Sequence, residues 1–563
     1  MRIERKDPLP LTSTPMVSVI VPAYNEHENI INTVEKLNCL DYPNYEILVI
    51  NDGSSDESPK LERLLAEKYE RVRFINLKEN SGKANALYLG YIASKGEYLM
   101  CVDGDSYIAP DCLRYMIPHF IIPGNGERVG AVTGNPRVRN RSSLLAKIQI
   151  VEYASIISLI KRTQRIWGKV MTVSGVVVCY RKSALADCGL WDRDLITEDI
   201  GVTWKLERNF WDIRYEPRAI CWMLVPETLR GLAKQRKRWA QGGQEVMFRH
   251  ANLFKSWRRR RMIPIFLEQV CSLFWVLMWL LLTITEIFKL CYTSESYIPY
   301  LWKSQYLSVI CILQFAVAMC LEHRYDKKIF RNALVAAWYP LFYWVVTGIV
   351  ALWALPSSIG KRKKLATWSS PDRGIKTSDE KQKSSYKSDA TVGFSVSSKE
   401  AKAKASASLN QYKVDDEDII IGKQVWWKKI IECILTVFTW VYILMYPTYI
   451  VYGLITLHKG GVPREVWIYN VGVIYESGRL LYITAIIFLI EVAVLLIWKE
   501  YNYFRFAKKN RRTFRPNVTV SDTAEQFNIS EAFVENFQNS NIVDLEENII
   551  PEDFKWEDKK KNR

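Results

Sequence analysis

The sequence lacks the paired cysteines that mark zinc sites, redox motifs and disulfide frameworks. Its 11 cysteines are scattered singly among 563 residues, their number is odd, and no CxxC pair occurs. This usage predicts reduced thiols in a cytosolic setting. The formal charge of +17 comes without zinc-finger spacing or an RNA-binding signature, so we expect no nucleic acid among the partners.

The start of the sequence also lacks the pattern of a signal peptide, and we expect none. The first residues, MRIERKDPLP, are polar and lead directly into a predicted strand. The positive excess lies largely beside apolar runs, and four arginines at 258–261 immediately precede one of them. This placement is typical of the cytosolic flanks of membrane helices and of contact with anionic lipids. We therefore expect a multi-pass protein of the inner (plasma) membrane, with membrane lipids among its partners.

After a short N-terminal extension (1–16), residues 17–255 have the pattern of an α/β domain. The β-rich runs VSVIVPAY, YEILVIND, VRFINLK and EYLMCVDGD alternate with helical stretches such as ENIINTVEKL and KANALYLGYIA. Such alternation predicts a mainly parallel sheet covered by helices. Ligands of these sheets bind at the carboxyl ends of the strands.

Long apolar stretches follow this domain. Those near 262–288, 304–321 and 330–355 approach the roughly 20 residues that span a bilayer. A later polar tract is too poor in apolar residues to bury a core, and two more apolar stretches come after it. The expected order is therefore interfacial and transmembrane helices (256–360), a disordered linker (361–424), a transmembrane hairpin (425–510) and a charged cytosolic tail (511–563).

The charges around the linker constrain the membrane topology. KRKK at 361–364 begins the linker and Lys428 and Lys429 follow it, so both of its ends are predicted to be cytosolic. Three complete spans from a cytosolic catalytic domain would place KRKK outside. We therefore expect one of the three stretches to be interfacial or re-entrant. The first is the better candidate, because Glu268 and Gln269 in its opening turns would be costly in hydrocarbon.

Two aspartates follow the strand predicted in EYLMCVDGD. Asp103 and Asp105 are separated by one residue, and two such carboxylates can hold Mg²⁺ or Mn²⁺, which in turn binds a diphosphate. A polar turn is the alternative interpretation of this motif when it is taken alone. Further polar loops predicted at the same edge of the sheet favour the metal site.

These loops lie at Val21–Glu26, Asn51–Ser54 and Asn80–Ala86. In the second loop, Asp52 can accept a hydrogen bond from a nucleotide base. In the first loop, Tyr24 can stack on a ring. In the third, a glycine allows close backbone approach, and Lys83 or the helix N-terminus can meet phosphate charge. An ordinary turn and an ordinary helix start are the structural alternatives.

Two later motifs predict a second wall of the cleft. In TED, a carboxylate facing a sugar acceptor can remove a hydroxyl proton, although Thr197 as a helix N-cap is the alternative. In QRKRW, Arg236 and Arg238 suit a diphosphate and Trp239 suits a sugar face. The alternative is that these residues form an amphipathic helix at the membrane interface.

NDGSS, DGD, TED and QRKRW, in this order, resemble the processive family 2 glycosyltransferases, which include cellulose, chitin and hyaluronan synthases. The match covers about residues 17–355. VPAYNE, NSGKANALYLG, LITEDIGVTWKL and QRKRWAQGGQEV are most similar to the catalytic subunits of bacterial poly-β-1,6-N-acetylglucosamine synthases of biofilm systems. The resemblance implies an α/β GT-A domain followed by an α-helical transmembrane region.

The resemblance also implies roles for single residues. Those expected to bind the nucleotide donor are Ala23, Tyr24, Glu26, Asp52, Lys83, Asp103, Gln235, Arg238 and Trp239. Asp105 is expected to bind the metal and Asp199 to be the catalytic general base, while Glu198 and Trp239 face the acceptor. Arg236 and Lys237 are expected to be charges near the lipid surface.

The implied reaction is an inverting polymerisation. UDP-N-acetylglucosamine is the donor, the growing polysaccharide is the acceptor, and the β-1,6-linked product passes through the membrane into a biofilm matrix. A chitin or hyaluronan-type synthase of the same fold is an alternative. A catalytically silent, nucleotide-regulated membrane scaffold is another, although the intact DGD, TED and QRKRW argue against it.

The end of the chain carries a second resemblance. Its predicted hairpin followed by WKEYNYFRFAKKNRR is similar to the small accessory subunit of the same synthases, so we expect a fusion of two subunits. The two N-terminal transmembrane helices usual in catalytic subunits are not seen in this sequence, so we expect either a differently built pore or a hairpin, at 430–498, that substitutes for them. No RxxxR with a downstream DxSxxG occurs, which disfavours a cellulose synthase. The resemblance makes Arg505, Arg511 and Arg512 candidates for binding the activator cyclic-di-GMP.

Overall fold

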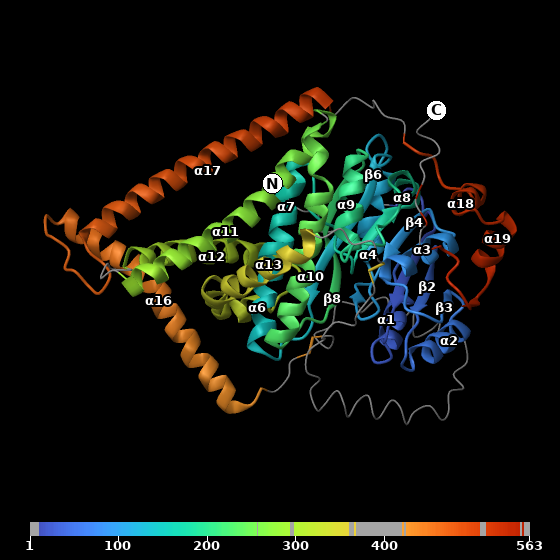
Figure 1. Ribbon diagram of the computed structural model, residues 1–563, viewed down its shortest axis with the longest axis horizontal. Coiled ribbons are helices and arrows are strands. Elements are labelled where there is room, and N and C mark those ends of the chain that lie inside the picture. Colours follow the sequence, from blue (N-terminus) through green and yellow to red (C-terminus); the bar gives the residue numbers. More distant parts are fainter. Residues whose placement is uncertain are drawn as a thin grey trace.

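The computed structural model describes residues 11–255, 257–292, 298–359, 365–366, 419–420, 424–506, 514–551, 554 and 556. Figure 1 shows an α/β part at one end and long helices that reach away from it. Arg511, Arg512, KRKK and most of the predicted linker lie outside the described residues.

A single nine-stranded sheet forms the centre of the α/β part. Its strand order is β5-β8-β6-β7-β4-β1-β2-β3-β9, and β1 pairs in parallel with both β2 and β4. The strands are β1 (Val17–Ala23), β2 (Tyr45–Asp52), β3 (Val72–Leu77), β4 (Tyr98–Cys101), β5 (Tyr107–Ile108), β6 (Val129–Val138), β7 (Val178–Arg181), β8 (Asp212–Met223) and β9 (Ile542–Leu545). The predicted α/β fold with a mainly parallel central part is confirmed.

Helices cover both faces of this sheet. Side chains alternate along each strand, so Val19 and Val21 of β1 pack into one core and Ile20 into the other. The helices of the α/β part are α1 (Ile30–Leu37), α2 (Ser58–Lys68), α3 (Lys83–Ala93), α4 (Cys112–Met116), α5 (Pro118–Ile121), α6 (Leu144–Glu152), a π-helix (Tyr153–Leu159), α7 (Ile160–Trp167), α8 (Lys182–Cys188), α9 (Glu198–Arg208) and α10 (Leu229–Arg249). Helices α1, α2 and α4 line one core, and α3, α8 and α9 line the other.

The C-terminal tail belongs to this fold. Helices α18 (Val520–Phe527) and α19 (Glu531–Asn539) precede β9, which pairs in parallel with β3. Phe527 and Phe537 pack into the same core as α3. The sequence predicted only a charged tail here, because apolar residues spaced among many polar ones gave no sign of a docking site.

Five helices within the described ranges are long and apolar enough to cross a membrane. They are α11 (Ile263–Tyr292), α12 (Ile298–Glu322), α13 (Trp344–Ile359) with the π-helix before it (Tyr339–Tyr343), α16 (Trp426–His458) and α17 (Val471–Phe506). Short 3-10 helices lie at Ala251–Lys255, Trp257–Met262 and Ile329–Ala337. In Figure 1, α11, α12, α16 and α17 extend away from the sheet, whereas α13 lies beside α10.

Contacts hold α13 and the π-helix before it against the α/β part. The Tyr343 hydroxyl and Arg236 of α10 are 2.8 Å apart, and Ser358 donates to Gln244, also of α10. Beyond α13, the Ala366 N–H donates to the Arg193 carbonyl. The chain therefore returns to the α/β part after α13.

The start of α11 also contacts the α/β part. Gln164 of α7 donates to both carboxylate oxygens of Glu268, at 2.9 and 3.0 Å. Glu268 therefore has a protein partner. Its polarity alone does not argue against the first apolar stretch as a membrane span.

Candidate active site

Three loops meet at one edge of the sheet because β1, β2 and β4 are mutually parallel. Ala23 ends β1, Asp52 ends β2, and Asp103 follows β4 by two residues. The motifs predicted to lie together therefore share one edge. We call the carboxylates and lysine gathered here the rim: Asp52, Lys83, Asp103, Asp105, Glu198 and Asp199.

Asp52 fixes the loop that carries Lys83. Its two oxygens accept from the Ser81 and Gly82 N–H groups, each at 2.9 Å. Burial raises the pKa of Asp52 to about 6, although these two backbone donors lower it. Gly82 has φ 93°, a conformation that other residues rarely adopt, so a glycine is needed at this turn.

The loop after β1 is tied to the loop after β2. The N–H of Asn25 donates to the Ser54 hydroxyl at 2.9 Å, and the N–H of Glu26 donates to Ser58 at 2.7 Å. Tyr24 is half-buried in this loop and Glu26 is buried. The predicted donor residues of the first loop are thus held beside Asp52.

Lys83 joins the DGD and TED motifs. Its ammonium group lies 2.6 Å from an Asp103 oxygen and 3.0 Å from a Glu198 oxygen. Burial opposes the charged form, but the two carboxylates outweigh it and raise the pKa of Lys83. Lys83 therefore stays protonated, and Glu198, predicted to face the acceptor, is engaged with it.

The DGD motif offers two carboxylates for a cation. Asp105 is 9% exposed and accepts from the Ser106 hydroxyl, and Asp103 is shared with Lys83. No group of three or more His, Cys, Asp or Glu side chains able to hold a metal occurs in the part of the chain that the structure describes. Two carboxylates suit a cation that takes its other ligands from substrate phosphates and water, as Mg²⁺ commonly does.

Asp199 lies in the first turn of α9, beside Glu198. Burial and the Glu198 carboxylate raise the pKa of Asp199 to about 6, while Lys83, the Ile200 N–H and Arg238 lower it. Its Oδ1 accepts from the Ile200 N–H at 2.9 Å. A carboxylate with this pKa is ionised at neutral pH and basic enough to accept a proton from a sugar hydroxyl.

Thr197 does not cap α9, contrary to the alternative that the sequence allowed. Its side chain makes no capping hydrogen bond and instead lies against Gly242 of α10. A Cβ on Gly242 would lie 1.9 Å from the Thr197 hydroxyl oxygen. The absence of a side chain at Gly242 therefore lets α10 approach the TED motif.

QRKRW lies on α10, and its residues differ in environment. We call Gln235, Arg238 and Trp239 the wall. Arg238 is exposed and near enough to Asp199 to lower its pKa. The Gln235 side-chain oxygen is buried, with no hydrogen-bond partner among the described residues. Trp239 is partly buried against the α6 and α12 cluster.

Arg236 is not the surface charge that was predicted. It is 7% exposed, donates to Glu152 at 2.6 Å and to the Tyr343 hydroxyl at 2.8 Å, and its guanidinium lies 4.2 Å from the Trp239 ring centre. Lys237 lies over the Trp353 ring of α13, at 3.7 Å from its centre. Arg236 therefore supports Trp239 from behind, and Lys237 faces α13.

Lys161 lies close to Asp199, although no sequence motif pointed to it. Lys161 is buried, donates to the Ser174 hydroxyl, and has its pKa lowered to about 7 by burial, an effect that Asp199 opposes. A Cβ on the neighbouring Gly175 would lie 3.3 Å from an Asp199 oxygen. Lysine in the ordinary helical run IKRTQRIW carries no motif, so only the fold brings it to the site.

Of the arginines suggested for cyclic-di-GMP, Arg505 alone is described. It is exposed in the last turn of α17, and α17 contacts α7. It does not belong to the rim or the wall.

Comparison with known proteins adds to this geometry. Residues 15–242 match the family model "Glycosyltransferase like family 2", and residues 420–548 match "PgaD-like protein". A poly-beta-1,6-N-acetyl-D-glucosamine synthase of Staphylococcus epidermidis is 44% identical over 366 residues, which is 64% of this chain and 87% of that protein. The chain belongs to this synthase family. It is a glycosyltransferase that carries a PgaD-like part on the same polypeptide.

The chain is similar to a second synthase and to a solved structure. The synthase of the same name from Staphylococcus aureus (strain COL) is 44% identical over 368 residues, again 64% of this chain and 87% of that protein. Among solved structures, the mannosyltransferase PcManGT from Pyrobaculum calidifontis, in complex with GDP-Man and Mn2+, aligns with a TM-score of 0.42 and 22% identity over 59% of this chain and 88% of that chain.

Proposed function

We propose that the chain polymerises N-acetylglucosamine from UDP-N-acetylglucosamine into β-1,6-linked poly-N-acetylglucosamine and passes the polymer through the membrane. The observation that carries the proposal is the position of Asp199. This ionisable carboxylate is near enough to Lys83 and to the exposed Arg238 of α10 for both cations to lower its pKa. The name of the staphylococcal relatives supports the choice of sugar and linkage.

The donor would bind along the rim. Asp52 and Tyr24 would hold the uridine, with Ala23 and Glu26 beside them. Lys83 would neutralise diphosphate charge as one of its carboxylate partners turns to the cation. Asp103 and Asp105 would hold Mg²⁺ or Mn²⁺, which when bound would stabilise the leaving diphosphate.

The acceptor would enter between the rim and the wall. Trp239 would offer an apolar surface to a sugar ring, and Asp199 would remove the proton of the attacking 6-hydroxyl. That oxygen would displace UDP from the anomeric carbon in one step and invert its configuration. Arg238 and the Gln235 oxygen would hold the departing diphosphate and the sugar hydroxyls.

The folded tail supports a topology in which both ends of the membrane region face one compartment, which we propose to be the cytosol. Because β9 lies in the catalytic sheet, the tail and the catalytic part share one side of the membrane, so an even number of helices must cross between them. Ala366 and Ile420 also bond to the catalytic part, which divides the crossings into two pairs. The pairs would be α11 with α12 and α16 with α17. The interfacial helix would then be α13, beside α10, and not the first stretch as the sequence suggested.

Cyclic-di-GMP would act as an activator through Arg505, Arg511 and Arg512. The exposed position of Arg505 at the end of α17 suits a soluble anionic ligand. Adding cyclic-di-GMP to membranes should raise the rate of UDP release, and Arg505→Gln should reduce that increase. An identical increase in the variant would remove Arg505 from the activator site.

One assay tests the proposed product. Membranes containing the protein are given UDP-N-acetylglucosamine with Mg²⁺ or Mn²⁺, and the polymer is treated with a β-1,6-specific hydrolase or with a chitinase. We expect the first enzyme alone to digest it. Membranes with Asp199→Asn are the control for polymer made by other proteins. Digestion by chitinase alone would show a chitin-type synthase and overturn the proposal.

A further inference from the structure

A short turn of the α/β part, residues 173–175, lies against Asp199. The Val173 N–H donates to the Thr203 hydroxyl, which in turn donates to the Asp199 carbonyl. At the end of the turn, a Cβ on Gly175 would lie 3.3 Å from Asp199 Oδ2, so a side chain there would crowd the carboxylate. The position of this turn is therefore tied to the position of the proposed base.

Lys161 of α7 supports the middle of this turn. Its ammonium group donates to the hydroxyl of Ser174, whose own N–H donates to the Thr133 hydroxyl of β6 at 2.8 Å. Lys161 is 5% exposed, whereas Ser174 and Asp199 are both partly exposed. Lys161 is therefore shielded from a sugar acceptor that meets Ser174 and Asp199.

The burial of Lys161 is unusual, because lysine side chains are almost never buried unless they are paired. Lys161 makes no ion pair in the part of the chain that the structure describes. Burial lowers the pKa of Lys161 to about 7, and the charge of Asp199 raises it. Such an interaction is reciprocal, so the protonated lysine favours the ionised form of Asp199 by the same free energy. At pH 6, below its own pKa, Lys161 carries the charge that this effect needs.

The other charges around Asp199 take part in the proposed reaction. Glu198, its neighbour on α9, raises the pKa of Asp199, whereas Lys83 of α3 and Arg238 of α10 lower it. A bound diphosphate would neutralise these two cations, so they would favour the ionised base less at the moment when it acts. Lys161 binds a hydroxyl instead, so its charge would persist when the donor is bound.

We propose that Lys161 is a positioning residue of the polymerisation. It holds the 173–175 turn against Asp199, and its charge keeps that carboxylate ionised, so that it accepts the proton of the acceptor hydroxyl. After each transfer, the same charge helps Asp199 to release that proton to water before the next sugar arrives. This role rests on the proposed function of Asp199 as the general base.

The pH profile of UDP release tests this role. Lys161→Met preserves most of the aliphatic side chain and removes its charge. Without that cation Asp199 holds its proton more tightly, so the pH of half-maximal rate should rise by about one unit, from about 6 to about 7. Lys161→Arg restores a cation, and its profile should return to that of the unaltered protein. Rates are measured in membranes at saturating donor, and each is divided by the maximum rate of the same variant.

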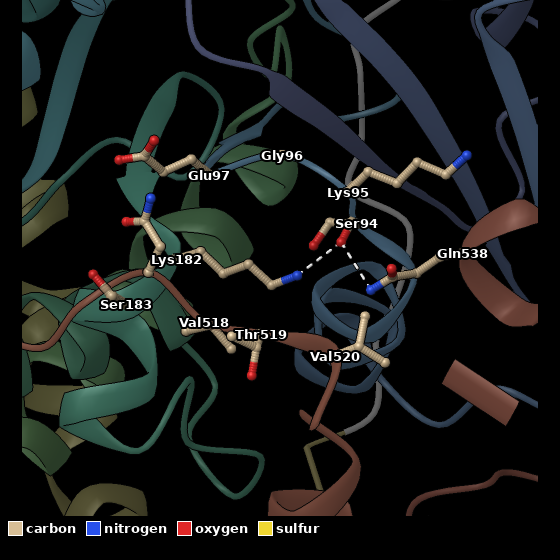
Figure 2. Close-up of a pocket in the computed structure, with 11 residues that line it drawn as sticks. Ser94, Lys95, Gly96, Glu97, Lys182, Ser183, Val518, Thr519, Val520 and Gln538 are labelled. Carbon is tan, nitrogen blue, oxygen red and sulfur yellow. Dashed lines mark hydrogen bonds between the residues drawn. The ribbon is translucent and has the colours of Figure 1, made fainter. Parts of the chain in front are cut away.

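The matched control is Lys182→Met on α8. Lys182 is also buried, its pKa is lowered to about 8 by burial, and Figure 2 shows it directed at the Ser94 carbonyl, to which it donates at 2.7 Å. It lines a cavity of about 290 Å³ between the catalytic part and the C-terminal tail. Its charge interacts with Glu46 and not with the base, so the pH of half-maximal rate should stay unchanged.

Ser174→Ala is a second variant for the case that Lys161→Met does not fold, which UDP binding reveals. Loss of the hydroxyl that accepts from the ammonium disfavours the charged form of Lys161. The pH of half-maximal rate should therefore rise in the same direction by a smaller amount.

A pH of half-maximal rate that stays at about 6 in both variants would overturn the proposal, because a merely structural lysine changes the maximum rate alone. An equal rise in Lys182→Met would also overturn it. A rate that does not fall at low pH in the unaltered protein would overturn this role together with that of Asp199. The identity of the polymer is decided separately by the hydrolase assay, because the pH profile follows UDP release whichever linkage is formed.

Discussion

The rim and the wall hold their charges in different ways. In the rim, each group is fixed by a neighbour, as Lys83 is by Asp103 and Glu198, and Asp52 by two backbone N–H groups. In the wall, Arg238 is exposed, whereas Arg236, two residues earlier, is buried and paired with Glu152. Residues two apart on a helix point about 200° away from each other, so this separation follows from helix geometry.

The difference shows how the site divides its work. A fixed carboxylate suits proton transfer, and a fixed lysine suits phosphate binding, because both need groups in position before the substrate arrives. An exposed arginine suits a leaving group that binds and departs in every cycle. Both regions meet at Thr197 and Gly242, where α10 touches the TED motif.

Asp199→Asn should have the largest effect, because it removes the proposed base and leaves the rim's shape intact. The rate of UDP release should fall by about 10³-fold or more, while the dissociation constant of UDP changes by less than about twofold. UDP binding is measured by calorimetry on the purified protein. Lost UDP binding would show that Asp199 supports the donor site and does not act as the base.

Gly242→Ala should have the next largest effect, because it pushes the wall away from the rim. The new Cβ meets the Thr197 side chain, and a displacement near 1 Å can cost about 10²-fold in turnover. Gly243→Ala is the matched control, since its Cβ would lie 3.4 Å from the nearest atom, Gln269 Nε2, and should leave turnover within about twofold. Equal losses in both variants would mean that α10 tolerates no alanine at either position. They would argue against a specific role for the contact between Gly242 and Thr197.

Arg238→Gln should reduce turnover by about tenfold, the value of one charge-assisted hydrogen bond to the leaving group. Lys237→Gln is its control, because Lys237 faces Trp353 on α13 and should change turnover by less than about twofold. Initial rates at saturating donor distinguish the two. A larger loss of turnover for Lys237→Gln than for Arg238→Gln would indicate that the leaving group binds on the Lys237 side of α10.

The smallest expected effect is on the pH profile. The pKa of Asp199 is raised to about 6, and a base must be deprotonated, so activity should rise with pH and reach half its maximum at about pH 6. Asp52 titrates in the same range, so the affinity for UDP is measured at each pH. A rate that stays constant down to pH 5, at saturating donor, would contradict the role of Asp199.

The sequence predicted the rim because strand ends of a parallel sheet must share an edge. Asp52, Asp103 and Lys83 each belong to a motif beside a strand or a helix start, so their meeting required only the strand pairing. Asp199 could be predicted as part of the rim because the TED motif lies at the start of a predicted helix. The order of the motifs along the chain therefore contained most of the rim.

Other features depended on contacts that no local pattern encodes. The position of Arg236 follows from the side of α10 that faces Glu152, and this is decided by packing against α6 and α13. Lys161 reaches Asp199 through the fold alone. β9 is four residues of ordinary composition that become a strand only beside β3, which lies more than 460 residues earlier in the chain.

The claim that the rim and the wall form one site can be tested most directly at their contact. UDP release is measured in membranes for the unaltered protein, Gly242→Ala, Thr197→Gly and the double variant. If the contact holds the two regions together, Thr197→Gly makes room for the new methyl group, and the double variant should be faster than Gly242→Ala alone, with a coupling of about 1 kcal/mol or more. Losses that simply add in the double variant would show that the two residues act independently and would contradict the account.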